Sequence, residues 1–247
     1  MLPPQKADAQ SFYVVPDLGS GHRGRVFRRL LDEAVVLLGN GRIPSVAEVA
    51  MASGVSRATA YRYFPSRSKL ISAVVAEALA PVRRAVPQEG DARQRLHELL
   101  ERTYTRFRDF EPHMRAALQL ALEHHALEAT GELKEEPFRR GQRTQVLATT
   151  LAPLRTQLGA HAFDRLIMAL SVAYGIESSV VLKDICGAST TESQAVVRWM
   201  MDSLVDTAVR EAAARPARVR VQVRVSNKQR AKPRPQKSGT TLRQRSD

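Results

Sequence analysis

The sequence predicts an all-α fold, in which a small N-terminal three-helix unit precedes a larger helical bundle. Apolar residues recur at spacings of three and four along most of the chain, which is the period of one helix face. Hydrophobic residues make up 43% of the chain and aromatic residues only 5%, so aliphatic side chains and alanine dominate its apolar set. That composition favours a folded, helix-rich chain. A period-two alternation occurs only at Val219–Val225, and the sequence shows no second strand pattern that could pair with it.

The N-terminal part of the chain begins with an arm and a first helix. Residues 1–21 hold three prolines and two glycines without a sustained period, so we expect a flexible arm. From Arg23 to Leu38 the apolar residues follow a helical period. The run Gly39–Gly41 should end this helix, because glycine and asparagine enter the left-handed cap conformation cheaply.

The stretch Ser45–Phe64 predicts two short helices joined by a tight turn. Ser45 and Glu48 have the spacing of a capping box, in which each side chain satisfies a free amide at the helix start. Gly54 stands where a tight turn needs a positive φ, and Ser56 can cap the next helix. Two short helices joined in this way must cross steeply and lean on a third, which is the pattern of a helix-turn-helix.

The second helix of this motif would project into a major groove of DNA, with its first two turns facing base edges. Its inward positions would be Ala60, Tyr61 or Phe64. The polar residues on its first two turns are Ser56, Arg57, Thr59 and Arg62.

Helical stripes continue beyond Pro81 and Pro87. We expect helices over 92–107, from Pro112 as a helix start to Leu122, over 147–158, and as a C-terminal pair over Phe163–Lys183 and Thr191–Arg210. Breaks are expected at Gly131, Gly159 and Gly187. The organisation that follows is an arm (1–21), a DNA-binding domain (22–80), a helical domain (81–214) and a tail (215–247).

Charge is concentrated in two of these parts. The net charge is +13; residues 215–247 carry eleven Lys and Arg against one acidic residue, and residues 22–80 carry nine against four. Such a distribution suggests a polyanionic partner. The tail cannot bury enough apolar surface to fold, so it should be disordered and add phosphate contacts without reading sequence.

Other classes of function find little support in the sequence. Cys186 is the single cysteine, so neither an intramolecular disulfide nor a cysteine-based zinc site can form. The motifs of hydrolases, nucleotide-binding enzymes and zinc peptidases do not occur. We expect no catalytic residue, metal or cofactor. No run approaches the length of a membrane span, and no signal peptide precedes the arm, so a cytoplasmic protein is expected.

The stretch AEVAMASGVSRATAYRYFPSRSKL resembles the DNA-binding domain of TetR/AcrR-type repressors. The resemblance implies a three-helix DNA reader followed by a helical domain that dimerises and usually holds a small ligand. It implies base contacts by Arg57 and Thr59 and phosphate contacts by Tyr61 and Tyr63. Arg67 stands where the family usually has a lysine. The full set of DNA-binding candidates is Ser45, Ser56, Arg57, Thr59, Tyr61, Arg62, Tyr63, Arg67 and Lys69. Ala58 replaces a common glycine and Ala60 a common leucine, which leaves the operator sequence open.

The helical domain offers an interface and a candidate pocket. The last helix has an apolar face wider than one core needs, which suits a two-fold dimer on near-palindromic double-stranded DNA. A ligand pocket could be lined by Tyr104, Phe107, Phe110, His113, Met114, His125 and Tyr174, although core packing is the more common reason for such residues. Two alternatives stay open: a general or architectural DNA-binding protein, and a DNA-binding domain fused to a protein-interaction module without a ligand.

Overall fold

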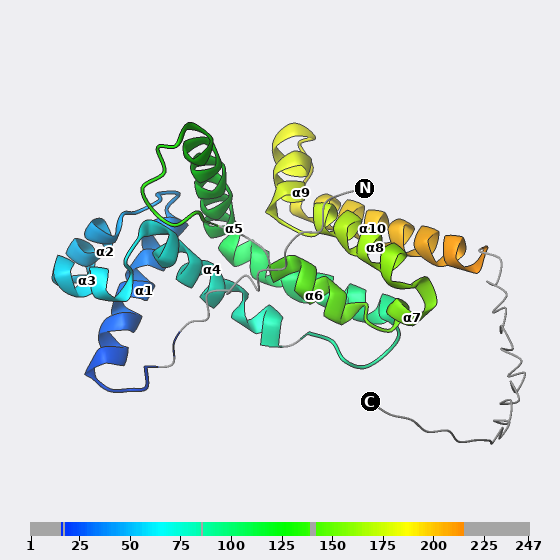
Figure 1. Cartoon of the computed structure of the whole chain (residues 1–247), viewed down its shortest axis with the longest axis horizontal. Coiled ribbons are helices and arrows are strands. Elements are labelled where there is room, and N and C mark those ends of the chain that lie inside the picture. The colour runs from blue at the N-terminus through cyan, green and yellow to red at the C-terminus, as the bar shows by residue number, and fades with distance from the viewer. Residues whose placement is uncertain (1–15, 17, 85, 139–141, 215–247) are drawn as a thin grey trace, which may run out of the picture. The chain divides into compact units, whose positions relative to one another are not determined.

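The computed structural model describes residues 16, 18–84, 86–138 and 142–214. Those residues form helices and no strand (Figure 1), so the predicted all-α fold is confirmed. The elements are α1 (His22–Gly39), α2 (Val46–Ser53), α3 (Arg57–Tyr63), α4 (Arg67–Arg84), α5 (Ala92–Thr130), α6 (Gln142–Thr150), α7 (Leu154–Leu158), α8 (Ala160–Ala173), α9 (Ile176–Val180), a π-helical turn (Val181–Ile185) and α10 (Thr190–Ala213). Nearly all of the predicted arm and the whole predicted tail, with its alternating stretch, lie outside the described residues.

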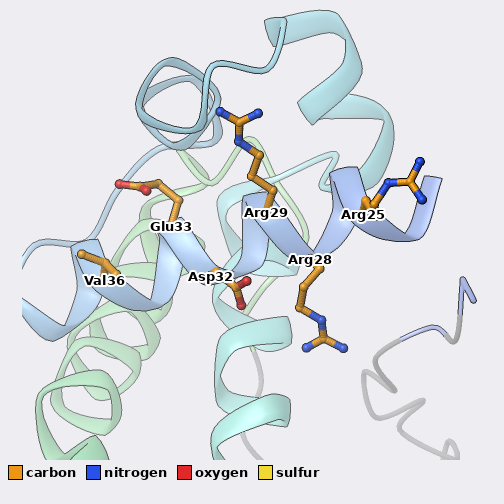
Figure 2. Close-up of a pocket in the computed structure, with 6 residues that line it drawn as sticks. All are labelled: Arg25, Arg28, Arg29, Asp32, Glu33 and Val36. Carbon is orange, nitrogen blue, oxygen red and sulfur yellow. The ribbon is translucent and has the colours of Figure 1, made fainter. Parts of the chain in front are cut away.

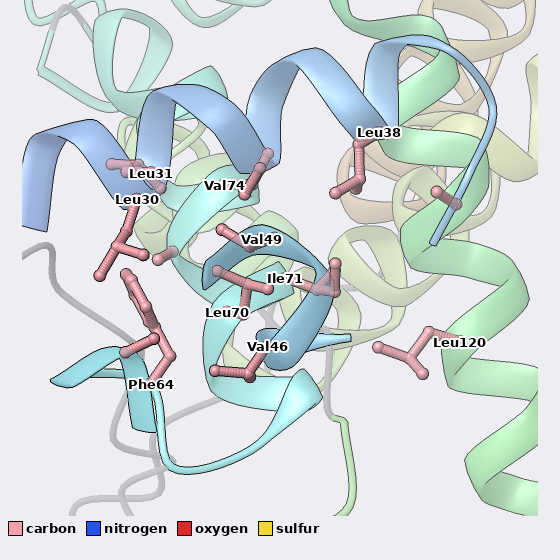
Figure 3. Packing of buried hydrophobic residues seen from close by; sticks show 14 of the residues in the cluster. Leu30, Leu31, Leu38, Val46, Val49, Phe64, Leu70, Ile71, Val74 and Leu120 are labelled. Carbon is pink, nitrogen blue, oxygen red and sulfur yellow. The ribbon is translucent and has the colours of Figure 1, made fainter. Parts of the chain in front are cut away.

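A first hydrophobic core joins α1, α2, α3 and α4 (Figure 3). The helix α1 packs against α2, α4 and α5, which gives the two short helices the third helix that the sequence required. Ala117 and Leu120 of α5 belong to the same core, as does Phe138 from the segment after α5. Its largest fully buried side chains are Leu30, Leu31, Leu38, Phe64, Leu70, Ile71 and Leu120.

A second hydrophobic core lies among α5, α6, α7, α8 and α10. The N-terminal half of α5 supplies Leu96, Leu99 and Leu100, and α8 packs on both α6 and α10. The helix α4 reaches this core only with Val82 near its end. The long helix α5 therefore contributes side chains to both cores.

The prediction of a helix start at Pro112 was wrong, because Pro112 lies inside the single 39-residue helix α5. A proline within a helix loses one backbone hydrogen bond and clashes with the preceding turn, at a cost of roughly 3 kcal/mol. Side chains on both sides of Pro112 are buried, Leu100 in the second core and Leu120 in the first. The burial along both halves outweighs the local penalty. Pro81 likewise lies within α4, so the predicted domain boundary at residue 80 falls inside a helix and stays a prediction.

The expected continuous helix Phe163–Lys183 is also wrong, because α8 ends at Ala173 and α9 begins at Ile176. Gly175 between them has an extended backbone, with φ 169° and ψ 179°. The hydroxyl of Ser178 donates to the carbonyls of Ala173 and Gly175, at 2.7 and 2.8 Å, so the break leaves these carbonyls satisfied. The stretch 147–158 is divided as well, into α6 and α7, whereas the breaks at Gly131, Gly159 and Gly187 are confirmed.

Within the described residues, no single helix is long and apolar enough to cross a membrane. The segments Ala160–Ala173 and Ile176–Ile185 are long and apolar enough for a membrane span only when taken together, and the chain bends by 41° between them.

Candidate DNA-binding surface

The start of α2 has the capping box that the sequence predicted. The amide of Glu48 donates to the Ser45 hydroxyl at 3.2 Å, and the Ser45 amide donates to the Glu48 carboxylate at 2.7 Å. The backbone N–H of Ser45 and then its hydroxyl hold the pKa of Glu48 below its usual value, with a smaller contribution from Arg42. Ser45 is half-buried and acts as a cap, so its hydroxyl shapes the motif at the position where a DNA contact was predicted.

The turn between α2 and α3 depends on Gly54, whose φ is 66°. The amide of Val55 closes the turn by donating to the carbonyl of Ala50 at 2.9 Å. A side chain at Gly54 would be strained by this backbone, and its Cβ would come within 3.3 Å of the Arg29 guanidinium. The predicted positive φ is confirmed, and Arg29 of α1 lies beside the turn.

The helix α3 divides its side chains between the core and solvent. Ser56 caps it as predicted, because its hydroxyl accepts from the amide of Thr59 at 3.2 Å. Ala60 and Phe64 are fully buried and anchor α3 to the first core. Tyr61 was grouped with these inward positions, and this was wrong, because its side chain is 45% exposed.

The outward face of α3 carries Arg57, Tyr61 and Arg62, all exposed. Thr59 is half-buried, and its hydroxyl accepts from the Ser56 hydroxyl at 2.9 Å. Two guanidinium groups and a phenol on one short helix can donate to base edges and to phosphate oxygens. The structure thus brings these predicted residues together on one surface.

Tyr63 has a different place from the one predicted. Its hydroxyl donates to the backbone carbonyl of Arg23 at 3.2 Å, and its ring lies 6.0 Å from that of Phe27. Since the phenol has one proton, this contact uses the donor that a phosphate would need. Tyr63 therefore ties the end of α3 to the start of α1.

Arg67 and Lys69, in the first turn of α4, already have carboxylate partners. Arg67 donates to Glu123 of α5 at 2.6 Å, and Lys69 lies 2.7 Å from the Glu136 carboxylate. Both partners come from beyond α4 in the sequence, so the motif alone gave no signal for them. Arg67 and Lys69 are thus paired with carboxylates, whereas Arg57 and Arg62 of α3 are exposed to solvent.

A row of arginines on α1 was missed as a candidate DNA contact (Figure 2). Arg25, Arg28 and Arg29 line an open hollow of about 390 Å³ together with Asp32, Glu33 and Val36. Arg28 pairs with Glu77 at 3.1 Å, while Arg25 donates to the backbone of Ser20. The hydrogen bond of Tyr63 with the start of α1, and the position of Arg29 beside the turn at Gly54, bring this row close to α3. The signal in the sequence was the spacing of Arg25 and Arg29 by one helical turn, opposite the apolar stripe.

Comparison with known proteins identifies this motif. The family described as bacterial regulatory proteins, tetR family, matches residues 30–74, from within α1 into α4. The HTH-type transcriptional repressor LfrR of Mycolicibacterium smegmatis is 32% identical over 90 residues, which cover 35% of this chain and 48% of that repressor. The chain is therefore similar to TetR-family proteins over its DNA-binding motif. It spans about half the length of this curated relative.

The residues predicted to line a pocket fall into two groups. Phe107, Phe110 and Met114 of α5 pack with Ala78 of α4 and Ile176 of α9. Tyr104 packs against the second core together with Tyr174. His125 is exposed, so the structure does not bring it to either group.

Burial shifts the pKa of three side chains among these residues, His113, Tyr174 and Tyr104. The Nε2 of His113 lies 2.8 Å from the carbonyl of Val35, and burial lowers the pKa of His113. The hydroxyls of Tyr174 and Thr103 are 2.7 Å apart, and burial raises the pKa of Tyr174 to about 12. Burial also raises the pKa of Tyr104. These phenols are uncharged at neutral pH and suit an uncharged neighbour.

Among the residues that the structure describes, no group of three or more His, Cys, Asp and Glu is placed to hold a metal ion. Glu177 and Asp184 bind cations of the same chain. Glu177 accepts two hydrogen bonds from Arg143, and Asp184 accepts two from Arg115.

The capping box leads to a prediction about acid stability. Glu48→Gln should lower the free energy of unfolding at neutral pH, because it removes the carboxylate that accepts from the Ser45 amide. The pKa of Glu48 is lowered in the folded state, so its contribution is complete above the unfolded pKa and is lost as the pH falls through the folded pKa. Urea unfolding from pH 7 to about pH 3 should therefore show the deficit of Glu48→Gln shrinking in acid. Ser56→Ala is the control, because the Ser56 hydroxyl caps α3 by accepting from the Thr59 amide, and a hydroxyl cap worth about 1 kcal/mol does not titrate. A deficit of Glu48→Gln that is the same at both ends of the pH range would contradict the assignment.

Proposed function

We propose that this chain is a sequence-specific DNA-binding transcriptional regulator that represses transcription by occupying an operator. The observation that carries the proposal is the exposed face of α3, where Arg57, Tyr61 and Arg62 stand on a helix anchored by Ala60 and Phe64. The match of residues 30–74 to bacterial regulatory proteins supports it, as does the similarity to a repressor. The family is one of regulators, so we expect no catalytic activity.

The proposal assigns a role to each exposed group. Arg57 and Thr59 contact base edges from the first turn of α3. Tyr61 and Arg62 contact phosphates beside the groove, and Arg25 and Arg29 extend these contacts along α1. Phosphate contacts set the position and the salt dependence of binding, whereas the base contacts set the preference for one sequence.

The direct test is to select genomic DNA fragments that the full chain binds and to footprint them. Protection of one or two near-palindromic sites supports the regulator. Diffuse protection of every fragment supports the second candidate, an architectural DNA-binding protein, which the net charge of +13 favours. A basic tail that adds affinity to every DNA remains a prediction, because residues 215–247 lie outside the described part of the chain.

We also propose a homodimer formed by α8 and α10. In the last helix, Val197, Met201 and Val205 are buried in the chain's own core, while Val196 is 36% and Trp199 70% exposed. On α8, Met168 and Val172 are exposed by 56% and 73%. Apolar surface left over after a core has packed is what a two-fold interface requires. A dimer places two α3 helices on one DNA, roughly one turn (about 34 Å) apart.

Trp199→Glu should convert this dimer into a monomer, because it introduces a charge where the proposed interface excludes water. Sedimentation velocity should show the smaller species, and operator binding should weaken because each monomer reads one half-site. Leu122→Glu is the matched control, since Leu122 is a 63% exposed apolar residue of α5 and belongs to neither helix of the proposed interface. Equal behaviour of the two variants would contradict the proposed interface.

We propose in addition that a small apolar or aromatic effector binds among the aromatic residues around Tyr104, Phe110 and Met114. The half-buried rings of Tyr104 and Phe110, together with the uncharged phenol of Tyr104, support an uncharged ligand. A thermal-shift screen of such compounds tests this, with an expected rise in Tm and the loss of that rise in Phe110→Ala. A screen without any rise supports the alternative of a protein-interaction module.

A further inference from the structure

The segment that follows α5 lies against the first turn of α4. We call residues 132–138 the acidic segment, because it includes Glu132, Glu135 and Glu136. The amide of Ser68 donates to the Glu135 carboxylate at 3.2 Å, and the Ser68 hydroxyl donates to the Glu136 carbonyl at 3.0 Å. The acidic segment and the start of α4 are therefore joined by hydrogen bonds through both backbone and side chains.

Carboxylates of α5 and of the acidic segment pair with Arg67 and Lys69, the two cations in the first turn of α4. Arg67 donates to Glu123 of α5 at 2.6 Å, and its Nε lies 3.9 Å from Glu135. Lys69 lies 2.7 Å from the Glu136 carboxylate. The Arg67 side chain is only 27% exposed, so it is enclosed by these partners, whereas Glu136 is 62% exposed and contacts Lys69 at the rim.

Buried groups anchor the acidic segment. Phe138 is 7% exposed and belongs to the first core. Its amide donates to Nδ1 of His124 at 3.1 Å, so the proton of the neutral ring is on Nε2, which lies 3.3 Å from Glu135. His124 is 2% exposed. The position of the acidic carboxylates is thus set by packing rather than by the surface ion pairs alone.

The cations concerned are close to the proposed DNA surface in the sequence, because only Phe64, Pro65 and Ser66 separate α3 from α4. We propose that Glu123 and the acidic segment compete with DNA phosphate for Arg67 and Lys69, and so hold the free chain in a state of lower DNA affinity. The proposal rests on the proposed function. The same guanidinium and ammonium groups can bind either a carboxylate or a phosphate, but not both in full.

This competition would couple the two cores. Glu123 lies on α5, and the acidic segment connects α5 to α6, while both helices also contribute to the second core. A displacement of the C-terminal half of α5 would therefore withdraw carboxylates from α4 and free its cations for DNA. The chain would carry an internal competitor whose strength depends on the helical domain.

The test measures DNA binding of the full chain and of Glu136→Gln, Glu123→Gln and the double variant. Fluorescence anisotropy is followed from low to high salt, with a selected operator fragment and an unrelated duplex of equal length. Each single variant should bind both duplexes about twofold to fivefold more tightly, the range expected from losing one partly exposed ion pair. The plot of log affinity against log salt should steepen by about 0.9 for each cation released to a phosphate.

Glu132→Gln is the matched control, because it removes the same charge from the acidic segment without touching Arg67 or Lys69 in the contacts described. It should leave affinity and salt slope within error of the unaltered chain. A merely structural role for Glu123 and Glu136 predicts weaker binding, so unchanged or weaker binding of their variants overturns the competition. If the unaltered chain binds no duplex at any salt concentration, the proposed function itself fails, and the competition with it.

Discussion

Phe64→Ala should destabilise the chain by about 3–5 kcal/mol and abolish operator binding, which is the largest effect expected from one substitution in α3 or at its C-cap. Phe64 is fully buried at the end of α3, and its ring lies 5.2 Å from that of Phe27 in α1. Its removal leaves a cavity between α1, α3 and α4 that rigid helices cannot close. The recognition surface then loses the anchor that orients it.

Urea unfolding followed by circular dichroism measures this loss. The control is Tyr61→Ala, which removes an aromatic side chain of the same helix from a position that is 45% exposed. We expect Tyr61→Ala to weaken DNA binding while changing the free energy of unfolding by less than about 0.5 kcal/mol, as is usual for surface substitutions. If the two variants lost equal stability, the assignment of inward and outward faces of α3 would be wrong.

Arg57→Ala should have the largest effect on sequence preference. A base contact by a guanidinium discriminates by about 1–3 kcal/mol, so operator binding should weaken by roughly tenfold to a hundredfold or more. Binding to unrelated DNA should change little in comparison. The DNA sites that the variant selects should lose the base preference at one position in each half-site.

The matched comparison for Arg57→Ala is Arg25→Ala, which removes a guanidinium from α1 instead of α3. Arg25 is proposed to contact phosphate, so its loss should weaken binding to every duplex alike and reduce the salt slope by about 1. Equal weakening of operator and unrelated DNA by Arg57→Ala would assign Arg57 to the phosphates as well.

Local features of the DNA-binding motif could be predicted because they depend on neighbours in the sequence. The box of Ser45 and Glu48, the positive φ of Gly54 and the cap of Ser56 each involve atoms within a few residues of one another. Backbone sterics and free helix-end amides decide such features before any tertiary contact forms.

Contacts between distant parts of the chain could not be predicted in the same way. Tyr63 donates to a carbonyl 40 residues away, and Arg67 to a carboxylate 56 residues away. Pro112 was expected to start a helix, because a proline inside a helix is destabilising. The burial of α5 side chains on both sides of Pro112, in two hydrophobic cores, stabilises the continuous helix by more than this cost. The same limit applies to the bend at Gly175, where carbonyls freed by the break are satisfied by a serine hydroxyl.

The sequence by itself determined the helical class, the turn and caps of the DNA-binding motif, and the residue types available to meet DNA, because periodicity, φ preference and charge are local properties. Only the tertiary structure decided which of those residues are free. Packing sends Ala60 and Phe64 inward and leaves Arg57 exposed, and it places carboxylates from beyond α4 on Arg67 and Lys69. A side chain whose donors already have partners in the fold must give up those contacts before it can bind DNA.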